Sequence, residues 1–227
     1  KLLWFFTVPC LRHEVYLIPR GGIDVGGRRA SVDEVCEALA TAWRGVTADP
    51  KRAAAILATI QSPATLELVA SIRDAGARRG SLVVDSSPYA HPDCPDARTA
   101  SPLLLRVTPD ARDLYCEERF GPIGFVVETE DAGAALQAAT ADVRESGGIT
   151  AFVYSTREDF VAQAESAYAV AGAQLTCNLS GPMPLNFAAS YSDYHVTGLN
   201  PAGNATLTDA SFVAARFRIA QSRRPVA

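Results

Sequence analysis

Between residues 123 and 177, apolar runs of strand length alternate with amphipathic runs of helix length. The strand-like runs are 123–128, 149–154 and 173–177, and helix-like runs near 131–145 and 157–171 separate them. An order of strand, helix, strand, helix, strand is typical of parallel strands joined by crossover helices. The alternation therefore predicts an α/β fold, a three-layer parallel-sheet domain with helices on both faces.

The first half of the chain carries the same two kinds of pattern. Ser31 and Glu34 have the spacing of a capping box at the start of a helix. Pro50 and Pro63 each follow a capping-type residue, Asp49 and Ser62, and proline is favoured at the first position of a helix. We expect three helices from these points, and further strands at 14–18, 81–85 and 103–107.

Two segments between these elements have the composition of loops. Residues 86–102 contain prolines at 88, 92, 95 and 102, which favours an ordered loop or an arm. The glycine-rich segment from Gly21 to Gly27 follows a strand and precedes a helix, as a phosphate-binding loop would. It lacks the Lys-Ser/Thr of a P-loop and the spacing of the dinucleotide fingerprint, so a flexible surface loop is the preferred interpretation.

Composition narrows the class of protein. The 227 residues, 48% hydrophobic and 20% charged, suit a globular protein of one large domain or two small ones. A net charge of −4 does not indicate a nucleic-acid-binding protein. No apolar run approaches the ~20 residues that a membrane-spanning helix needs. Five cysteines without disulfide or zinc spacing indicate a reducing, cytoplasmic setting.

Two adjacent carboxylates, an aromatic residue and a Gly-Pro turn come directly before the strand-like run at 123–128. This stretch, Glu117-Glu118-Arg119-Phe120-Gly121-Pro122, resembles the Glu-Glu-x-Phe-Gly-Pro signature of the aldehyde dehydrogenase superfamily. The resemblance implies that Glu118 holds the nicotinamide ribose of NAD or NADP and that Phe120 packs beside the nicotinamide ring. The alternatives are a surface carboxylate for Glu118 and a core ring for Phe120.

The same resemblance implies a nucleophile. The family places its catalytic cysteine shortly before a strand that ends in proline, and Cys10 precedes the run 15–18 and Pro19 in that way. A Cys10 thiolate would attack the aldehyde carbonyl, the adduct would release hydride, and water or coenzyme A would resolve the thioester. The alternative for Cys10 is a small buried hydrophobic residue. Cys36, Cys177 and Cys116 are expected to be packing residues.

The resemblance covers roughly residues 7–220, and the segments 176–182 and 198–205 are similar to the phenylacetate-degradation (PaaN-type) branch of the superfamily. Departures are also present. Thr7-Val8-Pro9 replaces the usual Gly-Gln before the nucleophile, and no Glu-Leu-Gly-Gly segment supplies the family's general base.

The family's nucleotide-binding domain is missing as well. We therefore expect residues 1–227 to be a catalytic domain that acts on a small aldehyde, needs the missing domain as its partner, and is inactive alone. The alternative is a truncated, non-catalytic remnant with a structural or assembly role. Both the catalytic domain and the remnant could form a homo-oligomer.

Two further patterns are too weak to predict a functional site. His91 and Cys94 have metal-like spacing but amount to half a site, so we expect no metal. His195, next to Asp193-Tyr194, could orient a thiol in a Cys–His hydrolase pair, but a polar surface residue is the preferred interpretation.

Overall fold

The computed structural model describes residues 14–57, 59–117, 119–147, 150–178 and 222–223. The chain divides into two compact units, and the division falls between Ala135 and Leu136, near the start of one helix. In the part of the chain that is described, no helix is both long enough and apolar enough to cross a membrane.

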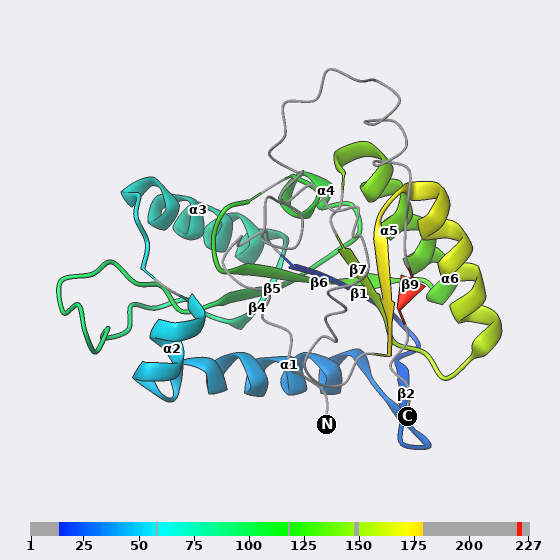
Figure 1. Ribbon diagram of the computed structural model, residues 1–227, viewed down its shortest axis with the longest axis horizontal. Coiled ribbons are helices and arrows are strands. Elements are labelled where there is room, and N and C mark those ends of the chain that lie inside the picture. Colours follow the sequence, from blue (N-terminus) through cyan, green and yellow to red (C-terminus); the bar gives the residue numbers. More distant parts are fainter. Residues whose placement is uncertain (1–13, 58, 118, 148–149, 179–221, 224–227) are drawn as a thin grey trace, which may run out of the picture. The chain divides into compact units, whose positions relative to one another are not determined.

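The first unit is built on a four-stranded sheet in the order β1–β6–β5–β4 (Figure 1). Its strands are β1 (Glu14–Pro19), β4 (Gly80–Val84), β5 (Leu103–Val107) and β6 (Ile123–Thr129). Its helices are α1 (Val32–Thr47), α2 (Pro50–Leu57), α3 (Pro63–Arg79) and α4 (Arg112–Tyr115). A separate two-stranded ribbon pairs β2 (Ile23–Val25) with β3 (Arg28–Ala30).

The helices of this unit begin where their capping residues indicate. Ser31 Oγ accepts from Glu34 N at 3.2 Å and Ser31 N donates to Glu34 Oε2 at 2.8 Å, which confirms the capping box of α1. At α2, Asp49 Oδ1 accepts from the main-chain N–H of Lys51 at 2.9 Å. Capping of this kind satisfies N–H groups that have no partner inside the helix.

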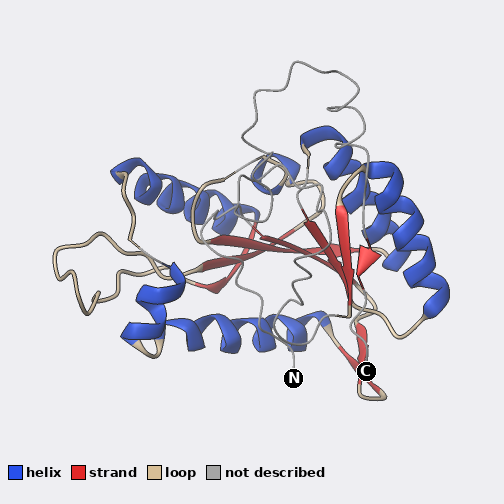
Figure 2. Ribbon diagram, viewed as in Figure 1, coloured by secondary structure: helices blue, strands red, loops and turns tan. Residues whose placement is uncertain are grey.

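Helices cover both faces of this sheet, as Figures 1 and 2 show. Successive residues of a strand point to opposite faces. Leu105 packs toward α3, where it fills the space beside Gly76, whereas Leu104 lies on the face of Trp43 from α1. The α3 face carries the larger described core, formed by Val69, Ile72, Leu103, Leu105, Val107, Ala111, Leu114, Tyr115, Ile123, Phe125 and Val127.

Strands β1, β5 and β6 run parallel, as predicted, but β4 pairs antiparallel with β5. The sheet is therefore mixed rather than all parallel. The connection from β4 to β5 is the proline-rich segment 86–102, which returns without a helix. Antiparallel neighbours can be joined in this way, whereas a parallel pair needs a crossover.

The proline-rich segment is an ordered arm whose two limbs are hydrogen-bonded to each other. Ser101 N donates to Ser87 O at 2.7 Å, and Tyr89 N donates to Thr99 Oγ1 at 2.9 Å. Arg98 ties the arm to the connection between α2 and α3, because its Nη2 donates to Gln61 O at 2.7 Å.

The glycine-rich segment 21–27 is not the flexible loop that its composition favours. Its second half belongs to the hairpin of β2 and β3, and Gly26 and Gly27 form the tip with positive φ angles of 58° and 79°. Two successive positive φ angles are the requirement of a type I′ hairpin turn. The two glycines therefore serve a tight turn and not a phosphate loop.

The second unit contains three parallel strands in the order β7–β8–β9. Its elements are most of α5 (Ala132–Ser146), then β7 (Thr150–Val153), α6 (Glu158–Ala171), β8 (Gln174–Cys177) and β9 (Ser222–Arg223). The core of this unit consists of Val161, Ala164, Tyr168, Ala173, Leu175 and Cys177, with Leu136, Ala139 and Val143 from α5 packed against it.

Asn178 ends the pairing of β7 with β8. It has a φ of 51°, and its amide group donates to Ser155 O and accepts from Ser155 N, both at 2.8 Å. The side-chain amide thus imitates a peptide group and extends the ladder by one step. Asn adopts the left-handed conformation more readily than most residues, because its short polar side chain bonds locally.

Candidate functional site

The amino ends of β1, β5 and β6 lie level with one another at one edge of the first unit's sheet. The register pairs Glu14 with Gly124 and Leu103 with Ile123. Phe120 directly precedes this edge, and the residue is 61% exposed. The edge therefore presents an aromatic face that the described residues leave uncovered.

The Gly-Pro turn between Phe120 and β6 is attached to both neighbouring elements. Leu103 N at the start of β5 donates to Pro122 O at 2.8 Å. A side chain at Gly121 would come within 3.4 Å of Val69 on α3, so the turn runs close against that helix. These contacts hold in place the Gly-Pro turn that directly follows Phe120.

The residue before Phe120 is a largely buried arginine. Arg119 Nη2 donates to the carbonyl oxygen of Asp113 in α4 at 2.7 Å and lies 2.8 Å from Glu117 Oε2. Only 20% of the Arg119 side chain is exposed, against 64% for Glu117. Arg119 was not predicted as a site residue, since nothing in the local sequence indicates that its side chain folds back onto α4.

A carboxyl group lies at the same edge, on β1. Glu14 accepts a hydrogen bond from the Tyr16 hydroxyl, and the Tyr16 ring meets Trp43 of α1 edge to face with centroids 6.3 Å apart. Burial raises the pKa of Glu14, and the hydrogen bond from Tyr16 opposes that rise. Glu14 was not predicted as a site residue, although residues two apart on a strand share a face and the Glu-x-Tyr spacing could have indicated the pair.

The carboxyl ends of the same strands carry paired charges instead. Arg106 on β5 donates from Nε to Glu128 Oε1 on β6 at 2.7 Å and also pairs with Asp33 at the start of α1. Ligands of parallel sheets usually bind at this edge. Here Arg106 links Asp33 of α1 to the sheet and pairs with Glu128 of β6, so the charged groups of this edge serve packing, which favours the amino edge as the functional one.

Of the predicted site residues, Phe120 is described, and Cys10 and Glu118 lie outside the described residues. Two predictions about other cysteines are confirmed, because Cys36 is 7% exposed and Cys177 is fully buried. Cys116 is partly buried against the core on the α3 face.

The weaker candidates stay without support. His91 Nδ1 accepts from the main-chain N–H groups of Asp93 and Cys94, at 3.2 and 3.1 Å, which is a local turn. Among the described residues, no cluster of three or more His, Cys, Asp or Glu side chains could hold a metal ion. Residues 193–195 lie outside the described part.

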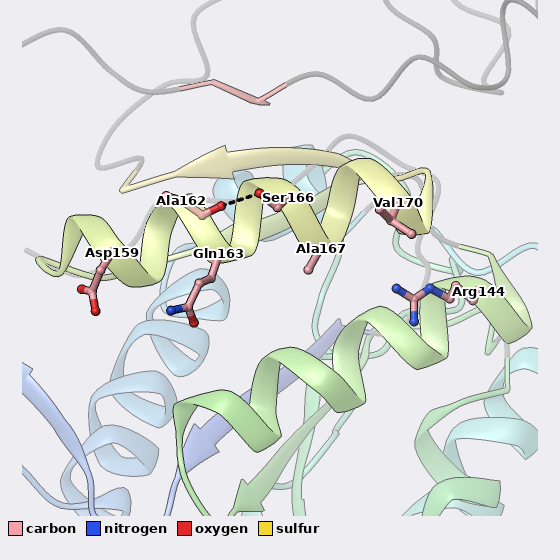
Figure 3. Close-up of a pocket in the computed structure, with 7 residues that line it drawn as sticks. All are labelled: Arg144, Asp159, Ala162, Gln163, Ser166, Ala167 and Val170. Carbon is pink, nitrogen blue, oxygen red and sulfur yellow. Dashed lines mark hydrogen bonds between the residues drawn. The ribbon is translucent and has the colours of Figure 1, made fainter.

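A shallow depression in the second unit lies between α5 and α6 (Figure 3). Its lining is made of Arg144, Asp159, Ala162, Gln163, Ser166, Ala167 and Val170. Ser166 Oγ donates to Ala162 O at 3.0 Å, so this hydroxyl is engaged within its own helix. The depression combines no nucleophile with a base, and it is not the candidate site.

Comparison with known protein families shows which family the chain belongs to. The sequence model of the aldehyde dehydrogenase family matches residues 28–181, which include the Phe120 turn and most of the described elements. The chain belongs to the aldehyde dehydrogenase family. The superfamily resemblance and the α/β fold expected from the sequence are thereby confirmed, whereas no comparison supports the phenylacetate-degradation branch.

Solved structures of other aldehyde dehydrogenases resemble the chain. An NAD-dependent aldehyde dehydrogenase from Burkholderia multivorans is 38% identical with a TM-score of 0.72, and the match covers 89% of this chain and 36% of that one. The chain thus spans about a third of the length of that enzyme. A search of curated protein sequences finds no match.

Two more distant structures share the fold. An NAD-dependent benzaldehyde dehydrogenase from Corynebacterium glutamicum is 22% identical with a TM-score of 0.55, covering 75% of this chain and 33% of that one. HpcC from Thermus thermophilus is 14% identical with a TM-score of 0.53, covering 76% of this chain and 38% of that one.

Proposed function

We propose that this chain is the catalytic region of an NAD-dependent aldehyde dehydrogenase that oxidises a small aldehyde to an acid or a thioester. The observation that carries the proposal is the exposed ring of Phe120, which a turn of the family's signature holds at the amino edge of the sheet. An exposed aromatic face suits contact with the flat ring of a nicotinamide. NAD is favoured over NADP because two of the similar structures are NAD-dependent enzymes.

In this proposal, Glu118 and Cys10 act at the same edge as Phe120. Glu118 is the residue two before Phe120, and its carboxylate would accept from the hydroxyls of the nicotinamide ribose. Cys10 precedes Glu14 by four residues, and Glu14 pairs with Gly124, four residues after Phe120. A chain of four residues spans at most about 14 Å, which is compatible with the proposed action of Cys10 at this edge.

The chemistry assigned to the chain's own residues begins with the Cys10 thiolate, which attacks the aldehyde carbonyl and forms a tetrahedral thiohemiacetal. When bound, the nicotinamide supplies the hydride acceptor. Phe120 and Glu118 would hold the cofactor's nicotinamide end. Loss of hydride leaves a thioester on Cys10, which water or coenzyme A then cleaves.

Finer features of the proposal rest on sequence resemblance. The segments 176–182 and 198–205 support a substrate from phenylacetate catabolism. The described free cysteines, at positions 36, 94, 116 and 177, are compatible with a reducing cytoplasm. Residues 1–227 are proposed to act as one catalytic region, with the arm 86–102 within it, together with a nucleotide-binding domain.

A chimera tests the proposal. The 227 residues replace the aligned region of the Burkholderia multivorans enzyme, and NADH formation at 340 nm is followed with aromatic and aliphatic aldehydes. We expect turnover in the chimera, its loss by at least about a thousandfold in Cys10→Ser because a hydroxyl is a far weaker nucleophile, and none from the 227 residues alone.

Cys36→Ser is the matched control, because Cys36 is buried on α1 and has no assigned chemical role. A Cys10→Ser chimera that keeps its activity would exclude Cys10 as the nucleophile. A correctly folded chimera without activity would favour the alternative, a non-catalytic remnant with a structural role. Sustained turnover by the 227 residues alone would contradict their proposed dependence on a nucleotide-binding domain.

A further inference from the structure

Arg119 is a charged side chain that lies mostly buried in a short connecting segment. Arginine is seldom buried, because removing its charge from water costs free energy unless the group is paired and hydrogen-bonded. Here one partner is the carbonyl oxygen of Asp113 at 2.7 Å and another is the Glu117 carboxylate at 2.8 Å. This hydrogen-bonded arginine directly precedes Phe120 and ties the chain at that point to α4.

The partner residue Asp113 is itself held from the other side. Arg79, at the end of α3, donates from Nη1 to both carboxylate oxygens of Asp113, at 2.7 and 2.6 Å. Arg79 Nη2 also contacts the carbonyl oxygen of Asp110 at 3.3 Å. The hydrogen bond from Arg79 lowers the pKa of Asp113, so this carboxyl is ionised at neutral pH.

These contacts form a continuous connection from α3, through Arg79 and Asp113, to Arg119 and the residue that follows it. Phe120 cannot hold its own place by packing, because the residue is 61% exposed. Its position before it meets a ligand therefore depends on the backbone: the single β-bridge that Phe120 itself forms, the Gly-Pro turn on one side and Arg119 on the other.

We propose that Arg119 is the positioning residue for Phe120, which directly follows it, and that Asp113, secured by Arg79, is the anchor of Arg119. The consequence for the cofactor rests on the proposed function: a segment held in place before binding pays less conformational entropy when the nicotinamide arrives. Arg119 acts through its neighbours and is not assigned a contact with the cofactor.

Hydrogen exchange followed by mass spectrometry on the 227-residue chain tests the positioning directly. Arg119→Ala should speed exchange in the peptide 117–122 by roughly ten- to hundredfold, the loss expected for a hydrogen bond from a charged donor. Arg119→Lys keeps one donor for the Asp113 carbonyl and should restore part of the protection. Arg79→Ala should give a smaller increase, because the Asp113 carbonyl stays in place.

Arg157→Ala is the matched control, since Arg157 forms an ion pair with Asp159 in the second unit and its side chain is 69% exposed. It should leave exchange at 117–122 unchanged. If Arg119→Ala is folded and its exchange there equals that of the wild-type chain, the positioning role is overturned. If Arg119→Ala does not fold, exchange at 117–122 in Arg119→Lys and Arg79→Ala is compared with the wild-type chain instead. Wild-type exchange in both folded variants would then overturn the positioning role.

Saturation-transfer NMR with NAD⁺ on the same proteins separates this inference from the proposed function. The two together predict a signal on the nicotinamide protons that is present in the wild-type chain, weakened several-fold in Arg119→Ala and partly recovered in Arg119→Lys. A wild-type chain without signal would count against cofactor contact by this chain, while the exchange data would still decide the positioning role. An undiminished signal in an Arg119→Ala chain with faster exchange would contradict the consequence for the cofactor.

Discussion

At the scale of single residues, the ionisation of Glu14 should change the stability of the first unit. Burial raises its pKa above the ordinary value of 4.5, so the folded chain holds this proton more tightly than the unfolded chain does. Below pH 4.5 both states carry the proton. As the pH rises further, the unfolded chain releases it first, and this contribution to stability is lost as the pH passes the folded-state pKa.

The variant Glu14→Gln should therefore be as stable as the wild-type chain at low pH and more stable at neutral pH. Glutamine keeps an oxygen that accepts from the Tyr16 hydroxyl, and it carries no charge. The measurement is the free energy of unfolding in urea at a series of pH values between 3 and 8. A Glu14→Gln difference that is constant across the series would show that the Glu14 pKa is the same in both states.

At the scale of elements, the close approach of α1 to the sheet depends on one glycine. A β-carbon at Gly124 would lie 2.3 Å from the Trp43 ring, far inside van der Waals contact, and Trp43 is 4% exposed and cannot turn away. Gly124→Ala should cost about 1–3 kcal/mol of stability, the usual range for overpacking a core. Thermal and urea unfolding measure this cost.

Gly45→Ala is the control for this comparison. Gly45 lies on α1 two residues after Trp43, and nothing approaches a β-carbon there within 4 Å. Alanine in a helix interior is favoured over glycine by roughly 0.5–1 kcal/mol, so this change should stabilise the chain. An equal loss of stability in both variants would show that contact with Trp43 is not the cause.

The helices and strands also show how much of the fold can be predicted from the sequence. Residue patterns predict α1, α2, α3, α5 and α6 and most of the parallel strands, because the cap at Ser31, the proline at the start of α3 and apolar periodicity are local signals. They do not predict the short helix α4 or the two-residue strand β9. The antiparallel direction of β4 and the β2–β3 hairpin were missed. Strand direction is decided by tertiary pairing, and the hairpin has only three residues in each strand, too few for a periodic pattern.

The candidate site was predictable to a similar degree. A family signature predicts Phe120 as a site residue, and the structure describes it as an exposed residue just before the sheet edge; its contact with a cofactor stays a prediction. Arg119 and Glu14 were missed because their importance lies in contacts with Asp113 and Tyr16, which only the folded chain brings within hydrogen-bonding distance.

At the scale of the whole molecule, the division into two units agrees with the distribution of the buried residues. The core on the α3 face draws its members from positions 69–127, and the core around α6 draws its buried members from 161–177. The described members of each core thus lie within one unit. Units with separate cores can open independently, as cooperative blocks of a larger chain do.

Two matched leucines test this independence. Leu105 and Leu175 are 0% and 1% exposed and belong to the first and second core, respectively. Truncating either to alanine should cost about 2–5 kcal/mol through lost contacts and a residual cavity. We expect hydrogen exchange in Leu175→Ala to accelerate in β7, β8 and α6 while β5 and β6 keep the wild-type rate, and the reverse in Leu105→Ala. If either substitution accelerates exchange equally in both sets of elements, the chain unfolds as one cooperative body, and the two cores are energetically coupled despite their separate membership.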